Sequence, residues 1–218
     1  MRHEEIMNGN HSSERGNSIL EFALVASFFL VPMLAGSYSI GMSLVKSLEV
    51  GQVCRDANIM VVRGVDLSQS DNQAIVVSTA SGLGMNISGT NNPNPSGLGE
   101  VILTTVHLVS SNDCAAVGLA TDACPNFNTY VITRRIYIGN NSMITSATGN
   151  PADTPASNGT LTLTQYVNDT GDQATGFPAL VTLTSGTDAY IAEAAFNISA
   201  INVFSIQQMG TIYARNIS

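Results

Sequence analysis

The sequence predicts an α+β fold in which one long N-terminal helix packs on an antiparallel β-sheet domain. An uncharged apolar run fills residues 22–45, and an amphipathic pattern of helical period continues it to residue 63. Beyond Gly64 the chain is rich in Ser, Thr, Asn and Gly and contains short β-branched runs. The second half of the helix is therefore expected to bury one face on a sheet formed by the C-terminal region.

The composition argues against several classes of function. The chain has 218 residues, of which 11% are charged, and its formal net charge is −8. Nucleic acid is an unsuitable partner for such a chain, because binding to phosphates requires clustered cations. Three cysteines are too few for a disulfide-dense scaffold, and three histidines leave little material for a metal site. We expect an exported acidic protein with no cofactor, no metal and no nucleic acid partner.

The apolar run over residues 22–45 predicts a membrane span. As a helix of ~1.5 Å per residue it reaches about 36 Å, more than the ~30 Å of bilayer hydrocarbon. It is also longer than the apolar core of a secretory signal, which is usually about 7–15 residues. Pro32 removes one backbone donor and is expected to bend the helix. The alternative is a removable signal that is cut near Ala35.

The amphipathic stretch that follows predicts a continuation of the same helix. Its apolar residues recur at helical spacing, and Gly64 after Arg63 is a typical helix stop. A membrane span followed by a separate short helix is the alternative. The apolar stripe consists of Val50, Val53, Cys54, Ala57 and Val61.

Glu21 is the unusual residue of this region, because it directly precedes the apolar run. An isolated carboxylate in hydrocarbon is strongly unfavourable, so acidic residues inside membranes are scarce and usually paired. The residue physics alone leaves two alternatives open. Glu21 either lies at the membrane interface and faces water, or it has a partner within the membrane.

The residues around Glu21 resemble a known processing signal. The string ERGNSILEF at residues 14–22 contains a cation, a glycine, four residues and then a glutamate that opens an apolar helix. It resembles the class III signal of type IV prepilins. With LEFALV at residues 20–25, it looks like the start of the TadE-like family, the pseudopilins of tight-adherence pilus systems.

This resemblance implies that the chain is a substrate and a structural subunit, not an enzyme. A prepilin peptidase would remove a leader at residues 1–16 by cutting between Gly16 and Asn17. Glu21 and Phe22 would then serve in assembly, with the Glu21 carboxylate paired to the N-terminal amine of a neighbouring subunit. The implied partners are the prepilin peptidase, other pilin or pseudopilin subunits and the pilus assembly platform.

The resemblance also implies a pilin-like architecture and a location. The helix at residues 17–64 would cross the bacterial inner membrane once and place residues 65–218 outside the cytoplasm. The charges near the two ends of the span do not set this orientation, since they do not favour a cytoplasmic N-terminus. Entry into a pilus or exposure at the cell surface would follow assembly.

The C-terminal region contains several candidate strands. The two strongest are residues 100–109 and 130–138, because both are rich in β-branched residues. Residues 200–215 are ambiguous between strand and helix. Weaker candidates are residues 74–80, 160–167, 179–184 and 188–199, the last with an irregular alternation that suggests a bulge.

Cys114 and Cys124 are expected to form a disulfide in an oxidising compartment. They enclose a short loop between two candidate strands, and such a bond contributes roughly 2–3 kcal/mol by chain-entropy estimates. Cys54 is then left over on the apolar helix stripe, where a buried thiol behaves as a small hydrophobic side chain. An intermolecular disulfide through Cys54, or a redox-active thiol, is the alternative.

The remaining polar motifs do not predict catalysis. His107, in the run VHLV, is interpreted as a strand side chain, and no second histidine or GxSxG motif supports a hydrolase. Residues 168–172 (NDTGD) are interpreted as a turn, with a calcium loop as the alternative. Arg134 and Arg135 are expected on opposite faces of a strand. Two rival functions stay open: a membrane-anchored surface binding module or adhesin unrelated to pili, and an exported β-rich enzyme.

Overall fold

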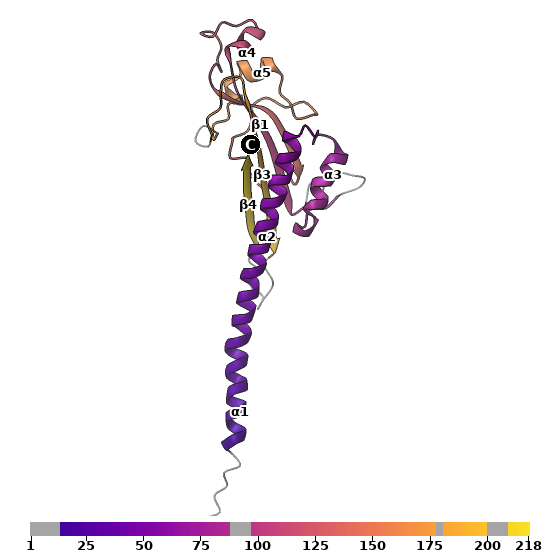
Figure 1. The fold of residues 1–218 in the computed structure, drawn as a ribbon, viewed down its shortest axis with the longest axis vertical. Coiled ribbons are helices and arrows are strands. Elements are labelled where there is room, and N and C mark those ends of the chain that lie inside the picture. Colours follow the sequence, from indigo (N-terminus) through magenta and orange to yellow (C-terminus); the bar gives the residue numbers. More distant parts are fainter. Residues whose placement is uncertain (1–13, 88–96, 178–180, 200–208) are drawn as a thin grey trace, which may run out of the picture.

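The computed structural model describes residues 14–87, 97–177, 181–199 and 209–218. A long helix leads into a domain with a four-stranded sheet and short helices (Figure 1). In chain order the elements are α1 (Glu14–Val25), the π-helical turn η1 (Ala26–Leu30), α2 (Val31–Val62), α3 (Ser70–Thr79), η2 (Ser81–Leu83), β1 (Gly99–Leu108), α4 (Ser111–Ala116), β2 (Tyr130–Gly139), α5 (Leu163–Asn168), η3 (Thr170–Asp172), β3 (Asp188–Ser199) and β4 (Met209–Ile217).

The helices α1, η1 and α2 form one continuous rod. Val25 and Val31, which flank η1, both have right-handed helical backbone angles. Pro32 accounts for the π-helical turn, because its missing N–H leaves the carbonyl four residues earlier without its α-helical donor. The rod ends at Arg63, and Gly64 follows with φ +79°. A single helix that continues from the apolar run into the domain is thus confirmed.

The sheet is antiparallel with the strand order β2-β1-β3-β4. The strands predicted at residues 100–109, 130–138 and 188–199 are confirmed as β1, β2 and β3. The bulge predicted in residues 188–199 is wrong, because β3 pairs in regular register with both β1 and β4. The register shift lies where β1 pairs with β2, between Thr105 and Val106. Of the ambiguous stretch, residues 200–208 lie outside the described residues, and the rest belongs to β4.

Three weaker strand predictions are wrong. Residues 74–80 lie mostly in α3, whose Val76 and Val77 are buried in the core, so an apolar run here belongs to a helix. Residues 160–167 lead into α5, which begins with a capping box in which Thr162 and Gln165 bond each other's backbone N–H. Residues 181–184 form no strand, and 179–180 lie outside the described residues.

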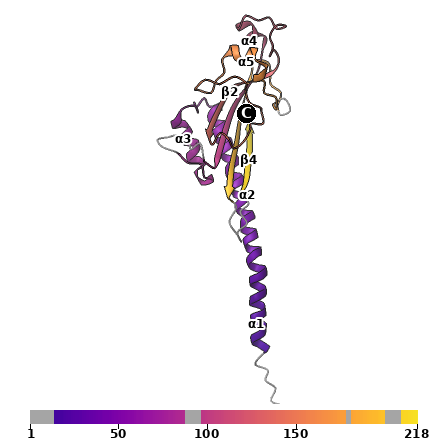
Figure 2. The same cartoon turned by 180° about the vertical axis from the view of Figure 1, so that it is seen from behind.

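The main core lies between α2 and one face of the sheet. Small side chains on β3, Ala192 and Ala194, allow α2 to approach closely, and α2 runs alongside β3 and β4 (Figures 1 and 2). The predicted apolar stripe of α2 is buried here, except that Val61 is only partly buried. The fold is therefore the expected one, with a helix packed on an antiparallel sheet.

Candidate membrane and assembly site

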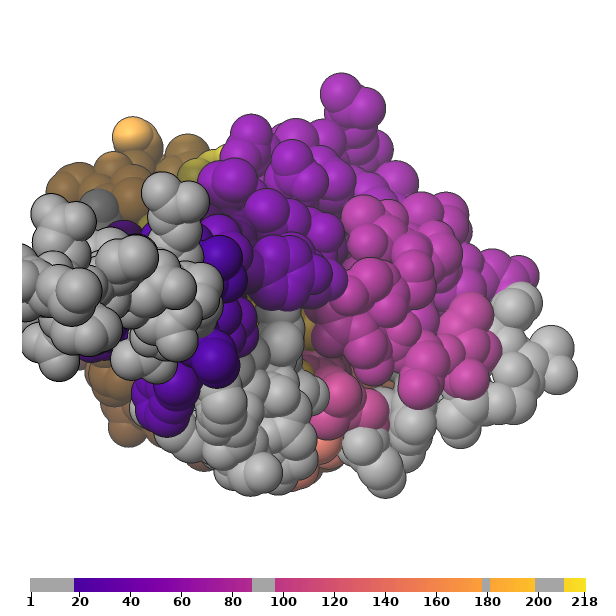
Figure 3. All heavy atoms as spheres, turned by 90° about the horizontal axis from the view of Figure 1, so that it is seen from below, coloured from indigo at the N-terminus to yellow at the C-terminus, as the bar shows by residue number. Residues whose placement is uncertain are grey.

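The first part of the long helix buries none of its side chains. No residue from 18 to 49 is buried, and Phe22 and Phe29 are each 73% exposed. The helix over Ser18–Val62 contains a window of mean hydropathy 2.1, all of it unburied. Among the described residues it is the one helix long and apolar enough to cross a membrane. Figure 3 looks at the molecule from the N-terminal end of this helix and shows the purple and magenta segment that follows it spreading to one side.

Glu21 lies in α1, at the free end of this rod. Its side chain is exposed between Leu20 and Phe22, and no partner for it occurs in the part of the chain that the structure describes. Gly16 and Asn17 lie in the first turn of the same helix. Asn17 and Glu21 are four residues apart, which in an α-helix corresponds to a rise of ~6 Å along the axis.

Lys46 marks the junction between the free helix and the domain. Its ammonium group donates to the carbonyl oxygen of Gly82 at 2.6 Å and to Glu49 Oε2 at 3.0 Å. Four residues later Val50 is completely buried. The domain therefore begins directly after the uncharged run, and the first cation beyond that run is held by the domain itself.

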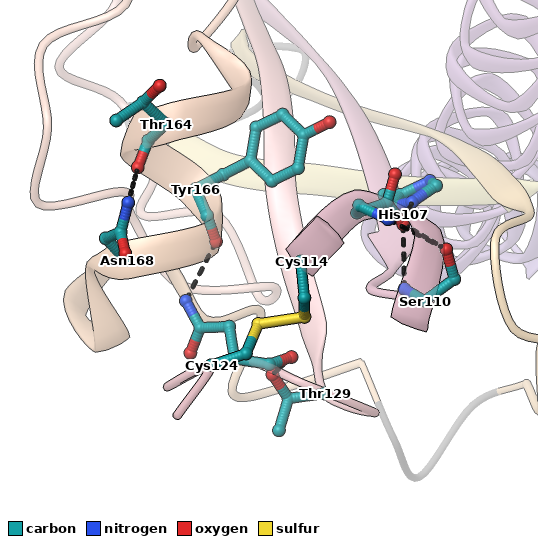
Figure 4. The surroundings of a disulfide bond; sticks show 10 residues. His107, Ser110, Cys114, Cys124, Thr129, Thr164, Tyr166 and Asn168 are labelled. Atoms are coloured by element: carbon teal, nitrogen blue, oxygen red, sulfur yellow. Dashed lines mark hydrogen bonds and ion pairs between the residues drawn. A yellow bond between two sulfur atoms is a disulfide. The ribbon is translucent and has the colours of Figure 1, made fainter. Parts of the chain in front are cut away.

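A disulfide staples the end of the domain that is opposite the free helix (Figures 1 and 4). The bond joins Cys114 of α4 to Cys124, with the Cα atoms 5.8 Å apart, so the predicted pairing is present. Cys54 is a free buried thiol on α2, as expected. Burial raises the pKa of Cys54 to about 11, and the thiol donates to the carbonyl oxygen of Ala192 at 3.1 Å. A thiol with these properties is unreactive at neutral pH.

His107 of β1 lies near the disulfide and contacts one carboxylate on α4 and one on β3. Its Nδ1 is 2.6 Å from Asp188 Oδ1, and its Nε2 is 3.0 Å from Asp113 Oδ2. Ser110 donates its hydroxyl to Asp113, not to His107. The cluster therefore lacks the serine–histidine contact that defines a Ser-His-Asp triad. The interpretation of His107 as a strand side chain holds, although its two carboxylate partners were not predicted.

The other face of the sheet carries a buried polar layer that the sequence did not predict. Glu100 and Glu193 are both fully buried. The Glu100 carboxylate accepts the backbone N–H groups of Met143 and Ile144, each at 3.0 Å. Burial raises the pKa of Glu100, while these two N–H groups act in the opposite direction. The carboxylate thus holds part of the β2–α5 connection on the sheet.

Glu193 is the centre of this layer. It accepts hydrogen bonds from the Ser146 hydroxyl, from the backbone N–H of Ala147 at 3.0 Å and from the Tyr213 hydroxyl at 2.5 Å. Arg215 lies 3.6 Å away. Burial, and then the Glu193 contact, raise the pKa of Tyr213 to about 12. This cluster joins β3, β4 and the β2–α5 connection.

The two adjacent arginines of β2 lie on opposite faces, as predicted. Arg134 pairs with Asp66 at 2.6 Å, and Arg135 is 2% exposed and donates to the carbonyl oxygen of Gly149 at 2.6 Å. Burial lowers the pKa of Arg135, and the negative charge of Glu193 opposes this effect. For the inward arginine an acidic partner or a route to water was expected; the groups to which Arg135 donates are instead the Thr148 hydroxyl and the Gly149 carbonyl oxygen.

The NDTGD segment ends α5 and continues into the turn η3, so the prediction of a turn is confirmed. Asp172 is nevertheless buried and not solvated, and its Oδ1 accepts the backbone N–H of Asp153 at 3.0 Å. Among the described residues no group of three His, Cys, Asp or Glu side chains is placed to hold a metal ion.

Comparison of the chain with protein-family models, with curated proteins and with solved structures gives no match. Of the predicted site residues, the structure brings Cys114 and Cys124 together and places Gly16, Asn17, Glu21 and Phe22 in one helix, where Glu21 and Phe22 are exposed.

Proposed function

We propose that this chain is a TadE-like pseudopilin or minor pilin that is cut by a prepilin peptidase and used in assembly of a tight-adherence (type IVb) pilus. The observation that supports the proposal is the unburied apolar helix with Glu21 at its free end. A helix of a water-soluble domain buries its apolar surface, and a simple anchor gains nothing from a carboxylate at this position.

The chemistry follows from the residues at the start of the helix. Gly16 has no side chain to obstruct a protease, and cleavage after it leaves an α-amine on Asn17. In an assembly of parallel helices, that amine would pair with the Glu21 carboxylate of a neighbouring subunit. The pair offsets the desolvation of both charges only with good geometry, so it disfavours arrangements in which Glu21 is unpaired.

The proposed location is the bacterial inner membrane, with the domain at residues 65–218 outside the cytoplasm. The disulfide between Cys114 and Cys124 supports this orientation, because disulfides persist in oxidising compartments. The assembly platform would then draw the subunit into the pilus as an initiator, tip or accessory component.

The assembly step is tested by Glu21→Gln in the full-length chain. We expect this variant to be cut and membrane-bound but to enter the pilus fraction at least about tenfold less than wild type, a factor that corresponds to ~1.4 kcal/mol. Asp56→Asn is the matched control, since Asp56 is an exposed acidic residue of the same helix and should assemble normally. Wild-type incorporation of Glu21→Gln would contradict the pairing role.

A membrane-anchored binding module or adhesin unrelated to pili is the second candidate. The observation that favours it is the disulfide-stapled end of the domain, which lies far from the membrane helix (Figure 1). Such a protein needs no leader cleavage and no carboxylate in the membrane. An uncut chain with normal surface binding after Glu21→Gln would support it.

A further inference from the structure

The two edges of the sheet differ in how the chain covers them. The outer edge of β2 is occupied by other segments of the same chain. The bonds are Arg135 N–H to Gly159 O at 2.7 Å, Leu161 N–H to Thr133 O at 2.8 Å and Ala174 N–H to Tyr130 O at 2.8 Å. At the opposite edge, β4 pairs with β3 alone within the described residues (Figure 2).

The register of β4 identifies which backbone groups point away from the sheet. Tyr190 and Ser218 exchange both backbone hydrogen bonds, at 2.8 and 2.9 Å. Along an antiparallel pair the residues alternate between facing the partner strand and facing away. The N–H and C=O groups that face away from β3 therefore belong to Thr211, Tyr213, Arg215 and Ile217. In the described parts of the chain these groups have no backbone partner.

This edge has few of the features that usually protect an exposed strand. β4 contains no proline, and its pairing with β3 has no register shift. Its one charged residue, Arg215, contacts Tyr213 at 3.0 Å and Glu193 at 3.6 Å. From Thr211 to Ile217 the outward groups extend over about 20 Å of regular strand. Natural proteins block such an edge with charges, prolines or bulges, because a free edge pairs with other chains.

We propose that β4 is a docking edge that receives an extended strand from a different polypeptide held in the same membrane. The incoming strand would form backbone hydrogen bonds to the four outward residues of β4. The side chains of the incoming strand would alternate between the two faces of the sheet. On the face that carries Ile212 and Ala214, apolar residues are favoured. On the opposite face, which carries Thr211, polar residues are favoured. One part of this proposal rests on the proposed function, namely that the partner is a subunit held in the same membrane.

A second copy of this chain does not fit the edge. Pairing of β4 with β2 of another copy is blocked, because that edge is already occupied. An antiparallel β4–β4 dimer would point the two long helices in opposite directions, since β4 and α2 lie along the same axis (Figure 1). A parallel twofold dimer places identical residues level with each other, whereas parallel pairing requires a stagger of one residue.

The test compares two substitutions at Thr211 in the full-length, membrane-inserted chain. Thr211→Pro and Thr211→Ala both lose the hydrogen bond from the Thr211 hydroxyl to Asn197 Oδ1, which is 2.7 Å long. Only proline also removes the outward N–H, and the ladder to β3 does not use that group. The two variants in detergent should therefore unfold at similar temperatures.

The first readout is hydrogen–deuterium exchange of residues 209–218. In the wild-type and Thr211→Ala assemblies we expect exchange at least about tenfold slower than in the purified chain in detergent. Thr211→Pro should lose most of that difference. Equal exchange in assembly and detergent, or equal protection of the two variants, would overturn the proposal.

The second readout is a photoreactive residue at Thr211 in an otherwise wild-type chain in cells. The expected product is a crosslink to one extended segment of a different polypeptide, together with the slowed exchange. A crosslink to a second copy of this chain, or no crosslink, overturns the proposal. Leader cleavage is scored in the same cells, so an uncut chain with a protected edge would refute the pilin assignment alone.

Discussion

His107 Nδ1 lies 2.6 Å from Asp188 Oδ1, and the other ring nitrogen faces the carboxylate of Asp113. A neutral imidazole has one N–H, so only the protonated ring donates to both carboxylates. The hydrogen bond to Asp188 is the main reason why the pKa of His107 is raised, while burial opposes it. The charge state of one side chain thus affects how β1, α4 and β3 are held together.

The two ion pairs of His107 predict that the stability of the domain depends on pH. The pKa is raised in the folded chain, so the stabilisation is complete below the unfolded pKa of about 6.5 and is lost as the pH rises through the folded pKa. His107→Ala should remove about 1.5–3 kcal/mol at pH 6 and less at pH 9. Thermal unfolding of the full chain in detergent measures the difference, and a loss that is the same at both pH values would contradict this prediction.

The three cysteines should differ in reactivity. We expect no thiol to react with a maleimide at neutral pH in the native chain, because Cys54 is buried and its pKa is raised to about 11. One thiol should react in denaturant, and three should react in denaturant with a reductant. Cys54→Ala should lower each denatured count by one. A thiol that reacts in the native protein would show that Cys54 is accessible.

Removal of the Glu193 carboxylate should destabilise the domain strongly. Glu193→Ala leaves Ser146, the backbone of Ala147 and Tyr213 without their acceptor, and we expect a loss of about 3–5 kcal/mol in chemical unfolding. Glu49→Ala is the control, because a partly exposed pair with Lys46 is worth under about 1 kcal/mol. Equal losses for the two variants would exclude a structural role for the buried layer.

The long helix and the strands β1 and β2 could be predicted because their signals are local. An uncharged run and a stripe of period 3.6 define the helix, and β-branched runs define β1 and β2. The disulfide followed from two cysteines that flank one loop. In contrast, the apolar run in α3 is too short for its period to distinguish helix from strand, and tertiary packing of Val76 and Val77 decides it.

The polar layer could not be predicted, because its members are far apart in the sequence. Glu193 and Ser146 meet only after the sheet and its covering segment are formed, and a lone glutamate in a strand resembles a solvent-facing one. The helix α5 was more accessible to prediction. Thr162 and Gln165 form a recognisable capping box three residues apart, which is a local signal of a helix start.

Intact mass and N-terminal sequencing of the protein from its own membrane show directly whether the leader ends at Gly16. We expect a mature chain that begins at Asn17, loss of processing in Gly16→Leu and normal processing in Ala35→Leu. Retention of residues 1–16 in cells with an active prepilin peptidase, or a mature chain that begins near Gly36, would contradict this expectation.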